Sequence, residues 1–198
     1  VLVRNSVESS VANTTQIFVY APFRIATFSR TCSYLEQLNL SIHDARIYHG
    51  SDGMSLDTYY VLDHLGGPIE DPERLRHIGC LLADNLAAEV QAIVPRLTPR
   101  RIRSFDVATE TSLSLDETRD VSVLEVVSLD RPGLLARIGE VFVDLGLICE
   151  AAKIQTLGER VEDVFFITDT EQQPIRDSAM AEKIQRAIRD KLDHSEAA

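Results

Sequence analysis

One short segment combines residue types that could bind a small zwitterion. It reads Leu129-Asp130-Arg131-Pro132-Gly133-Leu134-Leu135, where an apolar run ends, a proline fixes the backbone and a glycine opens a helical pattern. The free amides and the positive dipole end of such a helix suit a carboxylate. Asp130 beside them could accept hydrogen bonds from an ammonium group. An equally simple interpretation needs no ligand, because Asp130 could cap the helix and Pro132 could occupy its first turn.

Other reactive side chains give weaker signals. His43 and His49 fall on one face of a predicted strand, but no third ligand accompanies them, so we expect no metal site. Cys32, Cys80 and Cys149 are odd in number, far apart and set in apolar contexts, which indicates reduced thiols and a cytoplasmic location. We therefore expect no catalytic residues and no cofactor in this segment.

Composition excludes several classes of protein. The 198 residues are long enough for two small domains, and a net charge of -11 opposes general binding to nucleic acid or anionic membranes. The basic run from Pro99 to Arg103 is better interpreted as a solvated linker than as a partner contact. No apolar run reaches 18 residues and no leader pattern is present, so we expect neither a membrane span nor a signal peptide. The chain begins with Val1, and we expect a fragment of a longer protein.

The elements that must position these residues occur twice. Residues 15–69 align with residues 122–175, and matching positions lie 107 residues apart early in the repeats and 106 apart later. Asp57 and Asp163 form one such pair. Two copies of one small unit predict two like domains with a shared surface where a ligand can bind.

Each repeat predicts the order strand, helix, strand, strand, helix. In repeat one these elements are expected at about 16–20, 25–38, 41–49, 56–62 and 72–88. In repeat two they are expected at about 123–127, 133–145, 148–157 and 161–168, with a last helix after Asp177. The helices show the three-and-four apolar spacing of one-faced helices. We therefore predict an α+β fold of two ferredoxin-like βαββαβ domains, with helices on one face of antiparallel sheets.

The fourth strand of each domain is the uncertain element. Too few residues follow the last helix to supply one, but residues 111–115 read as a strand that a turn joins to residues 123–127. We favour a hairpin there, with residues 1–3 in the same role in repeat one. The alternative is that residues 111–115 close repeat one in the usual order. The expected domains are 1–94 and 109–198, joined by a linker at 95–108.

The chain resembles ACT domains, the amino-acid-sensing modules found in tandem or as dimers. The motif from Asp130 to Leu135 carries this resemblance together with the strand and helix order. The closer resemblance is to the ACT pair of the bifunctional enzymes that uridylylate and deuridylylate the PII nitrogen-signalling protein. It rests on residues 105–110, on residues 156–165 (Thr-Leu-Gly-Glu-Arg-Val-Glu-Asp-Val-Phe) and on residues 39–45.

The resemblance implies a glutamine sensor. In that family the ACT pair reports glutamine to upstream nucleotidyltransferase and phosphohydrolase domains, which use Mg and act on PII. Neither catalytic signature occurs in this sequence, and His43-Asp44, the nearest approach to one, is expected on a strand. The partners implied are therefore glutamine or another amino acid, the upstream domains and, through them, PII.

The family pattern also implies two pseudo-symmetric sites, each between a strand–helix loop of one repeat and the second strand of the other. The residues expected to form the working site are Asp130, Gly133, Leu134, Leu135, Asn39 and Ser41. The other loop has Phe23 at the place of Asp130 and faces Ile148 at the place of Ser41, so we expect one amino acid per chain. Alternatively, both loops are only structural.

Two other functions remain to be compared. A stand-alone amino-acid-binding ACT protein would share the repeats and the Asp130 motif, but the missing Met at the start of the chain argues against it. An RNA-recognition module would stack bases on aromatic side chains of the central strands, for which Phe18, Tyr20, Tyr59 and Tyr60 are candidates. The acidic charge and the missing basic-aromatic signature argue against RNA.

Overall fold

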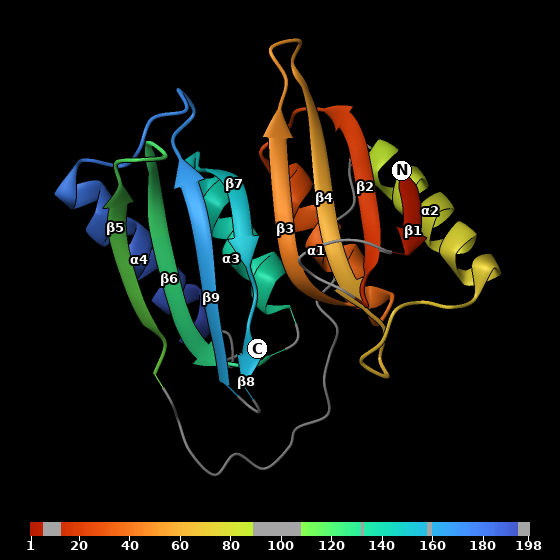
Figure 1. The fold of residues 1–198 in the computed structure, drawn as a ribbon. Coiled ribbons are helices and arrows are strands. Elements are labelled where there is room, and N and C mark those ends of the chain that lie inside the picture. Colours follow the sequence, from red (N-terminus) through yellow and green to blue (C-terminus); the bar gives the residue numbers. More distant parts are fainter. Residues whose placement is uncertain (6–12, 89–107, 132, 158–159, 194–198) are drawn as a thin grey trace.

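The computed structural model describes residues 1–5, 13–88, 108–131, 133–157 and 160–193, and it contains both predicted repeats (Figure 1). Repeat one consists of β1 (Leu2–Asn5), β2 (Thr15–Pro22), α1 (Ala26–Gln37), β3 (Ser41–His49), β4 (Met54–Leu62) and α2 (Pro72–Ala87). Repeat two consists of β5 (Glu110–Asp116), β6 (Val121–Leu129), α3 (Leu134–Leu145), β7 (Ile148–Lys153), β8 (Thr156–Leu157), β9 (Arg160–Thr168) and α4 (Ser178–Asp193).

The favoured hairpins are confirmed in both repeats. β5 pairs antiparallel with β6, with Thr111 opposite Val126 and Leu115 opposite Ser122, and β1 pairs antiparallel with β2. The strand order of each repeat, β1-β2-β4-β3 and β5-β6-β9-β7, is that of a ferredoxin-like sheet whose last strand comes first in the chain. The pairing protects β2 and β6 from becoming open edges.

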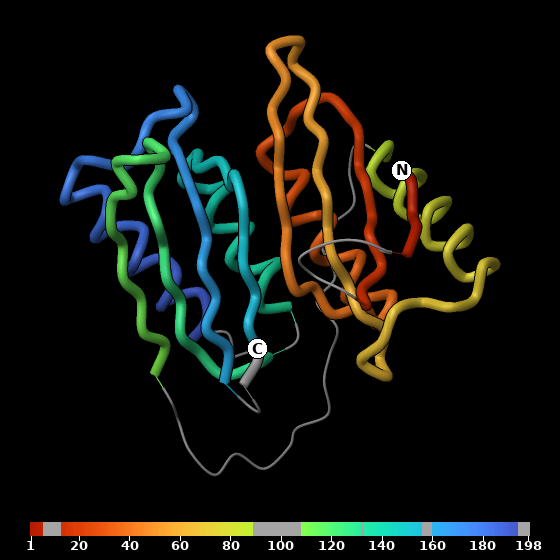
Figure 2. Tube along the Cα trace, viewed as in Figure 1, coloured from red at the N-terminus to blue at the C-terminus, as the bar shows by residue number. Residues whose placement is uncertain are grey.

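The two sheets join into one. β3 pairs antiparallel with β7, with Asp44 opposite Lys153 and Arg46 opposite Ala151, so the main path runs through eight strands. The amide of Ile154 extends the junction by donating to the carbonyl of His43 at 3.1 Å. The tube view shows β3 and β7 side by side at the centre of the sheet (Figure 2). The second strand of each repeat therefore borders the other repeat.

All four helices cover one face of this sheet (Figure 1). α1 and α3 pack against each other behind the junction, and Gly139 permits their close approach. A Cβ atom on Gly139 would lie 2.6 Å from Cβ and 2.8 Å from Cα of Ser29. Phe28 of α1 contacts the rings of Phe142 and Phe165 from repeat two, so the repeats share one hydrophobic core.

Several local predictions are confirmed. Asp71 caps α2 by accepting from the amide of Glu73 at 2.8 Å, with Pro72 in the first turn. Asn39 and Gly146 adopt positive φ angles of 58° and 65° at the ends of α1 and α3. Ile184 and Ile188 are buried on α4 as expected.

Other predictions differ from the structure or fall outside the described residues. The long strand expected at 148–157 is divided into β7 and β8, and the amide of Gln155 between them donates to Asp163 at 3.2 Å. The predicted linker at 95–108 and the turn at Gly158 lie almost wholly outside the described residues, so the domain boundaries stay predictions. No helix among the described residues is long and apolar enough to cross a bilayer.

Candidate functional site

The Asp130 segment, which we call loop two, leads from β6 into α3 at the junction between the repeats. Gly133 is the N-cap residue of α3, with a φ of 78°. Asp130 therefore does not cap the helix, so the interpretation of Asp130 as a helix cap that needs no ligand is wrong. Arg131 fixes the loop by donating to the carbonyl of Leu192 at 2.8 Å.

A carboxylate from the other repeat already lies at this helix start. The Gly133 amide donates a hydrogen bond to the carboxylate of Glu36, near the end of α1. The two residues are 97 positions apart in the chain, so this bond ties repeat one to repeat two. The contact is of the charge-assisted kind that an amino-acid carboxylate would make with the same amide.

The charge of Asp130 in loop two acts on a second carboxyl group of repeat two, that of Asp163. Asp163 on β9 is 1% exposed, and burial raises its pKa from 3.8 to about 7. The charge of Asp130 contributes to this rise in pKa, while the hydrogen bond from Gln155 acts in the opposite direction. Partial burial also raises the pKa of Asp130, although the residue as a whole is exposed. A ligand ammonium near this pair would relieve both effects.

The other residues expected at this site are placed as follows. Leu134 is buried and Leu135 packs partly buried against the core, so both can offer only their backbone to a ligand. Asn39 follows α1 and donates from its amide to the carbonyl of Glu36 at 2.8 Å. Ser41 is exposed at the first position of β3. The assignment of these residues to a ligand stays a prediction.

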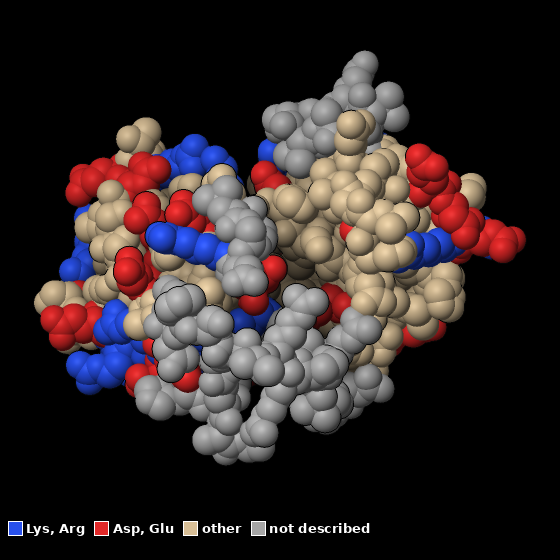
Figure 3. Space-filling view, turned by 90° about the horizontal axis from the view of Figure 1, so that it is seen from below, with Lys and Arg blue, Asp and Glu red and all other residues tan. Residues whose placement is uncertain are grey.

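The end of the molecule nearest loop two is shown in Figure 3. On the side of repeat two, acidic and basic side chains alternate, whereas the described surface of repeat one is mostly uncharged. In this view the described residues form no broad basic patch.

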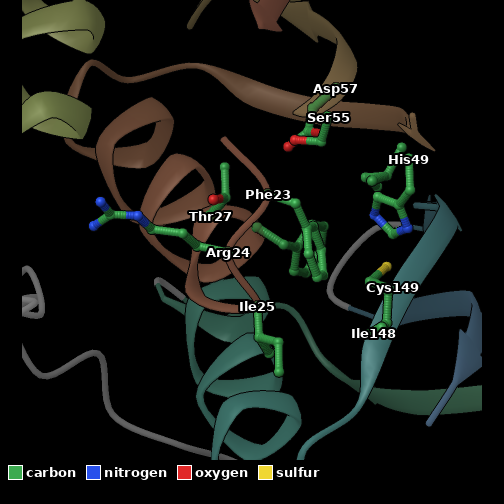
Figure 4. Close-up of a pocket in the computed structure, with 11 residues that line it drawn as sticks. Phe23, Arg24, Ile25, Thr27, His49, Ser55, Asp57, Ile148 and Cys149 are labelled. Carbon is green, nitrogen blue, oxygen red and sulfur yellow. The ribbon is translucent and has the colours of Figure 1, made fainter. Parts of the chain in front are cut away.

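A cavity lies at the other loop, for which the sequence predicted no working site. Loop one, which we define as Phe23 to Ile25, covers a small cavity that is partly open to solvent. Ile148 and Cys149 of repeat two form its far wall, so it lies between the repeats as the family pattern implied (Figure 4). The aromatic side chain of Phe23 packs against His49, with the ring centroids 4.4 Å apart.

Sequence reasoning missed the polar lining of this cavity. Ser55 and Asp57 on β4 line one wall and His49 another, while the guanidinium of Arg24 points away (Figure 4). The spacing between Asp57 and Asp163 was a usable signal, because a carboxylate repeated inside a predicted β-strand is unusual. It was used only to align the repeats.

Neither candidate site resembles a metal centre or a base-stacking platform. Among the described residues there is no group of three or more His, Cys, Asp or Glu side chains that could hold a metal ion. Two of the candidates for stacking bases, Tyr59 and Tyr60, are buried on β4. The RNA-binding alternative therefore loses two of its four aromatic residues.

Comparison with known proteins agrees with this architecture. Residues 117–195 match the family model described as the ACR family N-terminal ACT domain. Over 195 residues, 97% of its length, the chain is 43% identical to a bifunctional uridylyltransferase/uridylyl-removing enzyme of Azotobacter vinelandii. It is 45% identical over 191 residues, 95% of its length, to the enzyme of the same name from Pseudomonas syringae pv. tomato.

The chain spans 22% and 21% of the lengths of these two relatives. The similarity therefore concerns one part of much longer enzymes and covers both repeats of this chain. Residues 117–195 match the ACT-domain family, and the chain as a whole is similar to one part of the bifunctional uridylyltransferase/uridylyl-removing enzymes.

Proposed function

We propose that this chain senses glutamine and controls the uridylylation and deuridylylation of PII by catalytic domains elsewhere in the same polypeptide. The relatives that match nearly the whole chain carry both activities in their name. The proposal assigns the chain a regulatory role, and it assigns the nucleotidyl-transfer and hydrolytic chemistry, with its Mg, to the catalytic domains.

The observation that carries the proposal is the Glu36 carboxylate at the start of α3. It supports the idea that the Gly133 amide is oriented to hold a carboxylate between the repeats. In the proposed complex the α-carboxylate of glutamine replaces Glu36 at this amide. The α-ammonium group lies against Asp130, whose charge acts on the buried carboxyl of Asp163.

This exchange provides a way to transmit the signal. Displacing Glu36 breaks one link between α1 and α3, whose close packing behind the junction holds the repeats together. Binding would then favour an altered packing of the two repeats, provided that glutamine binds that packing more tightly. Asn39 and Ser41, which follow Glu36 in the chain, would change position with it.

Calorimetric titration of the chain with a panel of amino acids tests the proposal. We expect glutamine to bind at loop two, and we expect Asp130→Ala to weaken binding roughly 10- to 100-fold, because the ammonium group loses a charged partner. The matched change Phe23→Ala in loop one should weaken it much less. Equal losses in the two variants, or no binding of any amino acid, would contradict the proposal.

A test of the proposed regulation requires the longer polypeptide. In a protein that joins this chain to its catalytic domains, wild-type uridylylation should respond to glutamine and the Asp130→Ala variant should respond only at higher concentrations. Basal transfer without glutamine should be equal in both. If the variant responds to glutamine as the wild type does, loop two does not mediate the control by glutamine. Catalytic domains that behave identically without this chain would support the stand-alone amino-acid-binding alternative.

A further inference from the structure

The face of the sheet that the helices leave uncovered carries a row of exposed apolar side chains in repeat one. Tyr20 on β2 lies opposite Leu56 on β4, and Leu56 lies opposite Tyr48 on β3. Tyr59 and Val61 of β4 belong to the core beneath the helices, so Leu56, an odd number of positions away, points to the open face. Tyr20, Leu56 and Tyr48 are 62%, 40% and 71% exposed. Directly opposed residues lie close enough to form one continuous surface.

The row continues toward the edge of the sheet. Leu2 on β1 lies opposite Phe18 on β2 and is 59% exposed, and Phe18 shares a strand face with Tyr20. The guanidinium of Arg4 lies 4.9 Å from the centre of the Phe18 ring. We define the open-face patch as Leu2, Phe18, Tyr20, Tyr48 and Leu56. A contiguous apolar surface marks a contact site, whereas single exposed apolar residues are ordinary.

Repeat two shows that the fold does not require this patch. The strand pairings are the same in both repeats, so each patch residue has a counterpart at the same place in the other half of the sheet. In chain order of the patch residues, these counterparts are Ser112, Glu125, Val127, Gln155 and Glu162. Four of the five are polar or charged. The apolar surface is therefore a property of repeat one and not of the ferredoxin-like sheet.

The size of the patch and the charge of the chain indicate what kind of partner covers it. Five side chains are far fewer than the roughly 20–30 residues that each protein contributes to a stable complex. A net charge of -11 also opposes both nucleic acid and a second copy of the chain as the occupant. A domain joined to the chain needs less contact, because the tether gives it a high effective concentration. These properties favour a partner within the same polypeptide.

The longer relatives contain such a partner. The chain spans 22% of the length of the Azotobacter vinelandii enzyme, so most of a polypeptide of that kind lies outside the described structure. Val1 is 42% exposed and precedes Leu2 at the border of the patch. Figure 1 shows this end of the chain beside β2, and it shows the hairpin between β3 and β4 extending beyond the neighbouring strands. A polypeptide that continues beyond Val1 would leave the domain beside the patch.

We propose that the catalytic domains of the longer polypeptide dock on the open-face patch. This inference rests on the proposed function, because it takes this chain to regulate those domains, and it adds the surface through which they receive the signal. β3 begins at Ser41, which is expected at the glutamine site, and carries Tyr48 near its other end. A shift of β3 against β7 on glutamine binding therefore reaches the docked domains.

Hydroxyl-radical footprinting of the longer polypeptide tests the contact. Leu56→Glu gives repeat one the charge that Glu162 has in repeat two, and it should prevent docking. Tyr20 and Tyr48 should therefore be oxidised several-fold faster in this variant than in the wild type. Leu115→Glu is the matched control, because Leu115 on β5 is 41% exposed against 40% for Leu56, and it should leave the oxidation of both tyrosines unchanged.

Glutamine titration and uridylylation assays separate this inference from the proposed function. In Leu56→Glu, calorimetry should find glutamine bound as tightly as in the wild type, whereas uridylylation should no longer respond to glutamine. Absence of glutamine binding in the wild type would contradict the proposed function, and the footprint would still decide whether the patch is a docking surface. Tyr48→Gln, at a more exposed position, serves if Leu56→Glu does not fold, and oxidation is then measured at Tyr20.

Three results would overturn the inference. The first is equal oxidation of Tyr20 and Tyr48 in Leu56→Glu and in the wild type. The second is protection of these tyrosines that disappears on dilution, because it would assign the patch to a second copy of the chain. The third is a Leu56→Glu variant whose uridylylation responds to glutamine as the wild type does.

Discussion

The buried carboxyl of Asp163 should make the stability of this protein fall as the pH rises. Its pKa is about 7 in the folded chain against an ordinary value of 3.8. Between about pH 4 and pH 7 the folded state holds a proton that the unfolded state has released, so the free energy of unfolding decreases with pH across this window. The shift of about three pKa units corresponds to about 4 kcal/mol.

The substitution Asp163→Asn isolates this contribution. Asparagine keeps the shape of the protonated acid and an oxygen for the Gln155 amide, but it is neutral at every pH. At pH 4 the variant and the wild type should have nearly equal free energies of unfolding. At pH 8 the variant should be more stable by an amount on the order of 4 kcal/mol.

Urea unfolding followed by circular dichroism at several pH values measures this difference, provided that the slope of free energy against urea is the same in both proteins. Asp190→Asn, an exposed position on α4, is the matched control and should keep the pH dependence of the wild type, because it retains Asp163. Parallel stability curves for Asp163→Asn and the wild type would refute the reasoning, because they would mean that burial does not favour the neutral form of Asp163.

Three further predictions address the fold and the absence of catalysis. Gly139→Ala should destabilise the chain by about 1–3 kcal/mol, because the new Cβ would overlap Ser29. In the control variant Gly79→Ala the new Cβ meets Val3 at an ordinary 3.5 Å, so urea unfolding should show no comparable loss of stability. Cys80 is exposed, whereas burial raises the pKa of the thiols of Cys32 and Cys149, so a maleimide should label Cys80 first. Mass spectrometry after brief labelling measures this order, and modification of Cys149 at the same rate as Cys80 would contradict the prediction. The chain alone should not transfer uridylyl groups from labelled UTP to PII, and metal-dependent turnover by pure material would overturn its regulatory assignment.

The repeats, the helix and strand order and the hairpins could be predicted from the sequence because they depend on local patterns. Apolar residues at three-and-four spacing identify α1 and α3 whatever lies beside them. The pairing of residues 111–115 with β6 follows from the short turn between them and from the need to protect a strand edge. Left-handed positions such as Gly146 end helices for reasons confined to a few residues.

The candidate sites required the tertiary structure. The sequence identified Asp130 and Gly133, but it gave no sign that Glu36, 97 residues earlier, reaches the Gly133 amide. That contact depends on how closely α1 crosses α3, which the packing of Ser29 on Gly139 sets.

The same reason explains why the polar lining of the loop-one cavity could not be predicted from the sequence. The sequence assessed each loop by its own residues, so Phe23 indicated a site without polar groups. The polar lining comes instead from Asp57 and Ser55 on β4 and from His49 on β3. Their burial depends on which face of the sheet they occupy and on the wall that Ile148 supplies from the other repeat. Local sequence determined the elements of this protein, and the packing of one repeat against the other decided where its buried charges and its cavity lie.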